Sequence, residues 1–279
     1  MFLSRDWLFA WILVALLVLS MGDLRRWARG VVVDWLPLMA ALLLYDLSNG
    51  VREGLGVRPH VLPQLDADRL LDGSSVPTIG LQHALYAPGQ AHWYDYATFG
   101  VYLTHFFATL VVAVALWRFA HHRFARFRTL VVALATAGFV TYVLFPAAPP
   151  WLAAYDGHLP PVHRIVGEMW QHVGLAPAGA LFETRDAFYN QVAALPSLHA
   201  AYPVLLLLFF WGAGWRVRLG LGAYALAMGF TLVYTGEHYV SDILVGWVYA
   251  GLTFTVATAA WRLAERREPA AALTPARAG

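Results

Sequence analysis

The sequence predicts an all-α integral membrane protein: a bundle of six to seven helical spans with two long extracytoplasmic loops that carry short amphipathic helices. Three observations predict this fold class. Of the 279 residues, 59% are hydrophobic and only 13% are charged, whereas a soluble domain carries about a quarter charged residues. Apolar runs that approach the ~20 residues of a transmembrane helix recur along the chain. Arginines gather in several of the connectors between those runs.

The apolar runs give the order of the predicted spans. They cover residues 7–21, 31–47, 99–119, 130–145, 200–211, 219–234 and 239–261. The first run is slightly short for a span, and no small-residue cleavage site follows it, so we expect a signal anchor rather than a cleaved signal peptide. The sequence therefore predicts an N-terminal membrane anchor in 1–30, a membrane-embedded domain in 31–262 and a disordered cytoplasmic tail in 263–279.

Two long polar segments separate the spans, residues 49–97 and 146–195. In the first, residues 79–86 are expected to form a short helix in the membrane interface. In the second, apolar residues recur at helical spacing over 162–173, with polar residues mostly on the opposite side. This pattern predicts an amphipathic helix that lies flat on the membrane.

Arginine placement predicts the orientation of the bundle. If every run spans the membrane, the connectors with the arginines of 25–29, 118–128, 216–218 and 262–267 all fall on one side. Positively charged connectors stay in the cytoplasm. Both long loops are then extracytoplasmic, at a cell membrane. Without the first run the bundle has six spans and the same outer face.

Several chemistries are excluded by composition. The chain has no cysteine and therefore no disulfide or thiolate metal site, and all of its basic residues apart from histidine are arginine. Without lysine, neither Schiff-base chemistry nor a P-loop is possible. The net charge of +2 does not resemble a nucleic-acid-binding face. The expected partners are lipids: a phospholipid or polyprenyl phosphate as substrate, and the surrounding bilayer.

The last predicted span begins with a histidine and an aspartate. His238 and Asp242 are four residues apart, so a helix places them on one face. A carboxylate there accepts a hydrogen bond from one imidazole nitrogen, which fixes the tautomer and leaves the other nitrogen able to attack an electrophile. Taken alone, the pair more simply fits a helix start at which polar side chains only cap backbone N–H groups.

A second histidine begins the fifth span. His199 follows Pro196 and Ser197, a pattern typical of a helix start. The outward N–H groups and the positive dipole end of such a helix suit a phosphate, and the Ser197 hydroxyl adds a donor. Gly236 lets the chain approach an oxyanion closely. With His199 and His238 on one side of the membrane, an in-line displacement has both a nucleophile and an acid for the leaving oxygen.

Two stretches resemble the second and third motifs of the type 2 phosphatidic-acid phosphatase superfamily, which also includes vanadium haloperoxidases. They are Pro196-Ser197-Leu198-His199 and Gly236-Glu237-His238-Tyr239-Val240-Ser241-Asp242. A third stretch, Phe145-Pro-Ala-Ala-Pro-Pro-Trp151, resembles the inositol-phosphorylceramide synthase (inositolphosphotransferase)-like branch and its bacterial relatives. The resemblance covers roughly residues 95 to 255.

This resemblance implies roles for three residues. His238 would be the nucleophile that forms a phosphohistidine, Asp242 would orient it, and His199 would protonate the leaving group, with no metal or other cofactor. The chain departs from the family at its phosphate-binding cations. The first motif of the superfamily has a lysine and an Arg-Pro pair, and its third motif has an arginine at the position of Leu232, but this chain has no lysine at all.

Three residues are candidates to replace the missing cations: Arg164, Arg185 and His105. Each has an alternative interpretation. Arg164 and Glu168 have the spacing of an ordinary i,i+4 ion pair. Arg185 fits a solvated loop charge, and His105 fits an interhelical hydrogen bond.

The favoured function is transfer of an inositol-phosphate-type headgroup between lipids through a phosphohistidine, in preference to simple hydrolysis. A phosphatase acting on lipid phosphates or polyprenyl diphosphates is the alternative within the same chemistry. A zinc hydrolase that uses His199, His238 and Asp242 as ligands is a second class. A non-catalytic transporter or lipid-binding protein with a relic site is a third.

Overall fold

The computed structural model of the protein describes residues 23–41, 58–71, 73, 75–183 and 192–272, together with residues 14 and 18. Most of the predicted first span and the candidate Arg185 lie outside these residues. Within the described ranges all regular secondary structure is helical, apart from isolated bridges. This confirms the predicted all-α class.

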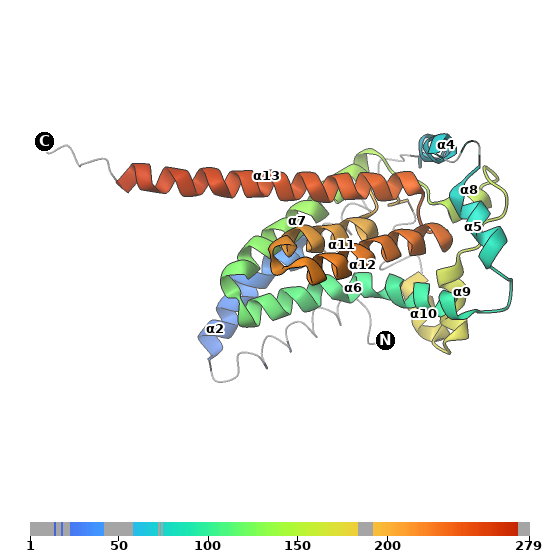
Figure 1. Cartoon of the computed structure of the whole chain (residues 1–279). Helices are drawn as coiled ribbons and strands as arrows, with labels where there is room; N and C mark the ends of the chain where they lie inside the picture. The colour runs from blue at the N-terminus through green and yellow to red at the C-terminus, as the bar shows by residue number, and fades with distance from the viewer. Residues whose placement is uncertain are drawn as a thin grey trace, which may run out of the picture.

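Four of the described helices are long and apolar enough to cross a membrane. They are α6 (Trp93–Phe119), α7 (His121–Leu144), α12 (Trp215–Tyr234) and α13 (Val240–Ala272). Two shorter apolar helices, at 30–41 and in α11 (Leu198–Phe209), lie among them. The first of these follows α2 (Leu24–Arg29) and begins with the π-helix η1 (Gly30–Trp35). The chain is therefore a multi-pass helical membrane protein (Figure 1).

Two helix boundaries differ from those expected. The basic connector at 121–128 is the first part of α7 rather than a loop. Arg and Ala favour helix, and Phe124 and Phe127 are fully buried there. The last helix, α13, continues past Trp261 to Ala272 (Figure 1). Arg126 of α7 donates to Glu265 at 2.5 Å, and this contact supports the added turns.

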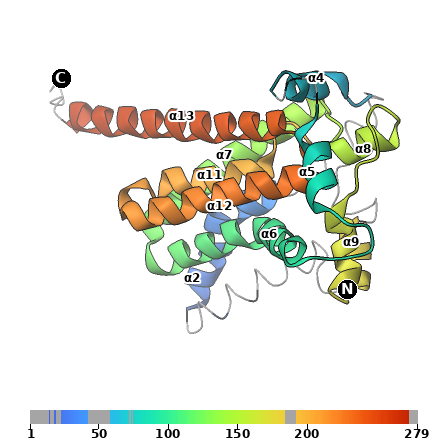
Figure 2. The same ribbon diagram turned by 45° about the vertical axis from the view of Figure 1, so that its right-hand side comes forward.

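Five short helices gather at one end of the bundle, where α13 begins (Figures 1 and 2). They are α4 (Leu62–Leu71), α5 (Pro77–Leu85), α8 (Pro150–Tyr155), α9 (Ile165–His172) and α10 (Ala176–Glu183). The connections from α6 to α7 and from α11 through η2 (Trp211–Ala213) to α12 lie at the other end. The arginines of 118–128 and 216–218 therefore lie at the opposite end of the bundle from the short helices.

The prediction that the amphipathic helix of the second loop lies on the membrane is wrong. Its apolar residues Ile165, Met169 and Trp170 are buried in a cluster with Phe99 and Tyr102 of α6. The rings of Trp170 and Phe99 meet edge to face with centroids 5.0 Å apart. The apolar face of α9 is therefore covered by the protein itself, which fixes this loop over the start of α6.

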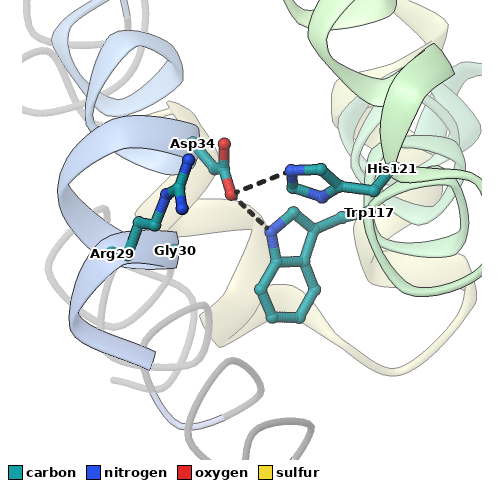
Figure 3. Close-up of a pocket in the computed structure, with 5 residues that line it drawn as sticks. All are labelled: Arg29, Gly30, Asp34, Trp117 and His121. Atoms are coloured by element: carbon teal, nitrogen blue, oxygen red, sulfur yellow. Dashed lines mark hydrogen bonds and ion pairs between the residues drawn. The ribbon is translucent and has the colours of Figure 1, made fainter. Parts of the chain in front are cut away.

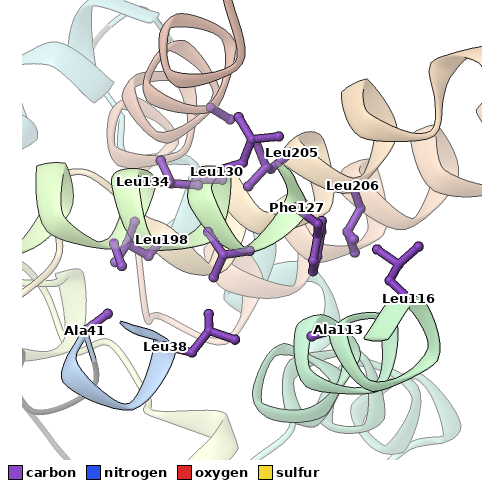
Figure 4. Packing of buried hydrophobic residues seen from close by; sticks show 14 of the residues in the cluster. Leu38, Ala41, Ala113, Leu116, Phe127, Leu130, Leu134, Leu198, Leu205 and Leu206 are labelled. Atoms are coloured by element: carbon purple, nitrogen blue, oxygen red, sulfur yellow. The ribbon is translucent and has the colours of Figure 1, made fainter. Parts of the chain in front are cut away.

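The main core holds the spanning helices together on the side away from that loop. Figure 4 shows Phe127, Leu130 and Leu134 of α7 packed near Leu198 and Leu205 of α11. Residue 138 of α7 is glycine, and a Cβ there would lie 3.0 Å from the Leu198 side chain. The start of α11 is thus set by close packing against α7.

Candidate active site

The fifth apolar run begins with an N-capped helix, as its sequence predicts. The buried Ser197 hydroxyl accepts a hydrogen bond from Ala200 N at 3.3 Å. Its O–H hydrogen can still be donated, because a hydroxyl both donates and accepts. His199 lies in the first turn of this helix, where the positive end of the dipole favours an anion.

The start of α13 is pressed against the start of α11. Ser197 N donates to the main-chain oxygen of Asp242 at 3.1 Å. A Cβ at Gly246 would lie only 2.3 Å from the Ser197 carbonyl oxygen. The backbone contact between the two histidine-bearing segments is therefore possible only because residue 246 has no side chain.

The two histidines predicted to act together are neighbours. The ring centroids of His199 and His238 are 5.6 Å apart, with planes inclined at 54°. They come from segments 39 residues apart in the sequence. His238 is 5% exposed and His199 is partly buried, so both rings lie in a site with little access to solvent.

His238 is held through Nδ1. This atom lies 3.0 Å from the main-chain oxygen of Ala194 and 3.5 Å from Asp242 Oδ2. An Nδ1–H that donates to the Ala194 carbonyl leaves Nε2 with its lone pair. The Ala194 carbonyl is the shorter contact, so the carboxylate shares the orienting role that the sequence assigned to it alone.

Both interpretations of Asp242 are seen in its contacts. The same oxygen that faces His238 accepts a hydrogen bond from Tyr239 N at 3.0 Å. Asp242 therefore caps the start of its own helix while lying beside the imidazole. It is fully buried, so its position is fixed from several directions.

The Phe145–Trp151 stretch positions the Ala194 carbonyl. Ala147 N donates to Val192 O at 2.7 Å, and Ala194 N donates to Ala147 O at 3.2 Å. These bonds tie the end of the second loop, just before the Pro-Ser-Leu-His turn, to its beginning. No sequence pattern predicts this role, because the group that contacts His238 is a backbone carbonyl.

The third histidine stacks on the second. The ring centroids of His105 and His199 are 3.8 Å apart, and Tyr102 stacks on His199 at 5.1 Å. Nε2 of His199 and Nδ1 of His105 are buried and have no hydrogen-bond partner among the described residues. His105 thus adjoins the site through His199, and this buried nitrogen makes no interhelical hydrogen bond to the described residues.

Arg164 does not pair with Glu168. Its Nε lies 2.9 Å from Oε1 of Glu237, the residue before His238, and its guanidinium lies over the Trp151 ring. Glu168 instead accepts from the Tyr86 hydroxyl and faces His163. Tertiary contacts override the i,i+4 spacing and bring a cation to the turn that carries His238.

Gly236 is expected to allow close approach of an oxyanion. In the structure, residues 162 and 163 of the second loop approach this glycine closely. Its φ is +79°, a conformation that favours glycine, and a Cβ would lie 2.9 Å from both the His163 carbonyl oxygen and Val162 Cγ1. The glycine therefore allows the second loop to pack against the turn that carries His238.

Two carboxylates that the sequence did not single out hold the site in place. Asp68 of α4 accepts from Val240 N and Ser241 N at 2.9 and 2.8 Å, and so caps α13. Asp95 of α6 accepts from the Tyr234 hydroxyl at 2.6 Å. Tyr234 and Tyr239 are fully buried.

Metal-type ligands are not grouped in the site. Among the described residues, no three His, Asp, Glu or Cys side chains are placed to hold one metal ion together. The zinc hypothesis, which required His199, His238 and Asp242 to converge, gains no support from this geometry.

Comparison with known proteins places the site in a family. The family model described as PAP2 superfamily matches residues 78–256, a range that contains both histidine motifs. The chain belongs to the PAP2 superfamily. No solved structure matches the chain.

Two proteins named as synthases or synthase subunits are similar to this chain. A phosphoinositol dihydroceramide synthase from Bacteroides thetaiotaomicron is 31% identical over 131 residues, which is 44% of this chain and 42% of that protein. The catalytic subunit of inositol phosphorylceramide synthase from Schizosaccharomyces pombe is 27% identical over 242 residues, 81% of this chain and 52% of that protein. The matched region thus spans about half or less of these relatives.

Proposed function

We propose that this chain is a lipid phosphotransferase that moves an inositol-phosphate-type headgroup through a phosphohistidine on His238. One observation carries the proposal: two imidazoles from distant segments have centroids 5.6 Å apart, and the Nδ1 of one is tied to a backbone carbonyl. Two contacts of hydrogen-bond length to a single phosphate span roughly 5 to 6 Å. One phosphoryl group can therefore meet a nitrogen of each ring.

In the first step, Nε2 of His238 attacks phosphorus of the donor lipid. The bond between phosphorus and the lipid oxygen breaks, and protonated His199 gives its proton to that oxygen. The Nδ1–H of His238 stays on the Ala194 carbonyl, and Asp242 stabilises the positive charge that develops on the ring. The headgroup is now held on His238 as a phosphoramidate.

In the second step, the hydroxyl of an acceptor lipid attacks the phosphohistidine. Neutral His199 takes the hydroxyl proton, the phosphorus–nitrogen bond breaks, and His238 regains its lone pair. The dipole at the start of α11 and the Arg164 guanidinium offset charge on the phosphoryl oxygens. We expect the Ser197 hydroxyl to donate its O–H to the same group.

The similarity to the two synthases supports the choice of donor and acceptor. By analogy with their names, we propose an inositol phospholipid as donor and a ceramide-type hydroxyl as acceptor. A lipid phosphatase acting on phosphatidic acid or a polyprenyl diphosphate uses the same first step, with water in the second. A product screen separates them: purified protein with each donor, with and without ceramide, analysed by mass spectrometry. Inositol phosphate from the inositol phospholipid, or free phosphate from phosphatidic acid, as the main product in the presence of ceramide would exclude transfer.

Alanine at either histidine tests the mechanism. His199→Ala and His238→Ala should each abolish turnover while melting temperatures in detergent stay near that of the wild type. Orthovanadate should inhibit, because it mimics five-coordinate phosphorus. Chelators should leave activity intact, whereas loss of activity on chelation would favour the zinc hypothesis. Wild-type function in the His238→Ala protein would indicate a non-catalytic transporter or lipid-binding protein.

We also propose that the active site lies on the extracytoplasmic face of a cell membrane, within the catalytic domain 31–262. The gathering of arginines at the opposite end of the bundle supports this orientation. Because the chain has no cysteine, a single introduced thiol reports one position. Tyr155→Cys, at a side chain that is 85% exposed, should react with an impermeant maleimide on intact cells, and Arg216→Cys should not. The reverse pattern would contradict the orientation.

A further inference from the structure

A cavity lined partly by polar residues lies at the end of the bundle that carries the arginines. Its volume is about 270 Å³, and it is lined by Arg29, Gly30, Asp34, Trp117 and His121 (Figure 3). Along α6, Trp117 is about 18 Å from His105, at a rise of 1.5 Å per residue. The cavity is therefore separate from the histidine site, and no step of the proposed reaction uses it.

The backbone beside this cavity is unusual. Residues 30–35 form a π-helix in which the Leu36 N–H bonds to the Val31 carbonyl. Such wide turns are rare and occur frequently at functional sites. A Cβ at Gly30 would lie 2.9 Å from Cζ2 of Trp117, so the indole packs directly on the π-helix and forms one wall.

The aspartate of the cavity is already compensated. Asp34 Oδ2 accepts from Trp117 Nε1 at 2.9 Å, and Asp34 Oδ1 lies 3.5 Å from Nη1 of Arg128. Arg128 also donates to the Val33 carbonyl at 2.6 Å, which holds its charge beside the carboxylate. One guanidinium thus balances the one carboxylate of the cavity.

A second guanidinium, that of Arg29, also lines the cavity. Figure 3 shows Arg29 beside Asp34 with no hydrogen bond or ion pair marked between them, and Arg29 has no hydrogen bond or ion pair with any other described residue. The ring of His121 lies opposite, with Nε2 at 3.7 Å from Asp34. The cavity therefore carries a surplus of positive charge and N–H donors, which is the chemistry that binds phosphate.

We propose that this cavity binds the phosphate group of an anion, either on a phospholipid headgroup or free in solution. Basic pockets between helices near the membrane surface commonly bind anionic headgroups. Val32, Val33 and Leu36 of the same segment are 60%, 51% and 50% exposed. These apolar side chains suit contact with acyl chains, so a lipid can place its phosphate at Arg29 and its chains along this helix.

Native mass spectrometry of the purified full chain tests the site. The probes are dioctanoyl phosphatidylglycerol, dioctanoylglycerol with the same chains but no phosphate, and inorganic phosphate. Arg29→Gln should weaken phosphatidylglycerol binding about tenfold, the size expected for a charged hydrogen bond. Arg25 and Arg29 are both exposed residues of α2, but Arg25 does not line the cavity. Arg25→Gln is therefore the matched control, and Arg29→Lys should retain part of the affinity.

The wild type and all of these variants keep the histidine site, so lipid binding there contributes equally to each measured affinity and does not affect the comparison. Arg29→Gln should also keep wild-type turnover, which separates this proposal from the proposed reaction. If millimolar inorganic phosphate displaces phosphatidylglycerol, the free anion is a ligand of the cavity. If it does not displace the lipid, the ligand is the lipid. Equal weakening by Arg29→Gln and Arg25→Gln, no weakening by Arg29→Gln, or equal binding of dioctanoylglycerol would overturn the proposal.

Discussion

Gly246 is the position at which a single methyl group should disturb the site most. In Gly246→Ala the new Cβ would lie 2.3 Å from the Ser197 carbonyl oxygen, whereas ordinary contacts begin at 3.4 Å. That oxygen belongs to the backbone and cannot rotate away. The starts of α11 and α13 must therefore part by about 1 Å, at an overpacking cost of about 1–3 kcal/mol.

This separation acts directly on the two histidines. His199 moves with α11 and His238 with the start of α13, and the bond from Ser197 N to the Asp242 oxygen lengthens from 3.1 Å. A misplacement of about 1 Å can cost about 10²-fold in rate. We therefore expect Gly246→Ala to lose about 100-fold in turnover while the protein still inserts and folds.

The assay compares two glycines of the same helix. A Cβ at Gly251 meets nothing within 4 Å, so Gly251→Ala should keep wild-type turnover and gain about 1 kcal/mol from helix propensity. Turnover is measured on the lipid donor, and stability by thermal unfolding in detergent. Wild-type turnover in Gly246→Ala, or equal losses in both variants, would refute the argument that this contact sets the distance between the rings.

Two further substitutions test the groups that hold the site. Asp68→Ala removes the acceptor of two backbone N–H groups at the start of α13, so we expect the free energy of unfolding to fall by about 2 kcal/mol and turnover to fall with it. Asp66→Ala, on the exposed side of α4, should change neither quantity. Equal melting temperatures for the two variants would exclude capping of α13 by α4. Asp242→Asn should lower turnover by about 10²-fold rather than the ~10⁴-fold known for other His–Asp pairs, because the Ala194 carbonyl still holds the Nδ1–H tautomer; a complete loss in a folded protein would show that the carbonyl does not suffice.

The four described helices long enough to cross a membrane, and the order of the histidine motifs, were predictable because each leaves a local signal. Apolar length identifies a membrane helix, and a histidine just after Pro-Ser identifies a helix start. The pairing of His199 with His238 followed from placing both on one side of the bundle. What the spacing could not give was the distance between the rings, since this depends on the packing of α11 on α13.

The supporting contacts were beyond local patterns. Asp68 caps a helix 172 residues later in the chain, and no spacing rule relates the two segments. The spacing of Arg164 and Glu168 predicted an i,i+4 pair, yet the structure pairs Arg164 with Glu237. Burial of α9 against α6 decides which face of that helix is available for such pairs. The Ala194 carbonyl has no side-chain signature at all.

The charge of the site bears on which phosphate ester it accepts. The family's lysine is absent, and residue 232, where its arginine would stand, is leucine. Among the described residues, Arg164 is a cation that reaches the turn carrying His238, and it faces the Glu237 carboxylate at 2.9 Å. A phosphate monoester carries about −1.5 to −2 charges at neutral pH, whereas a diester carries one. A site with fewer net positive charges should favour the diester. We therefore expect phosphatidylinositol to turn over faster than phosphatidic acid at equal surface concentration. Faster release of phosphate from phosphatidic acid would contradict both this charge argument and the preference for headgroup transfer.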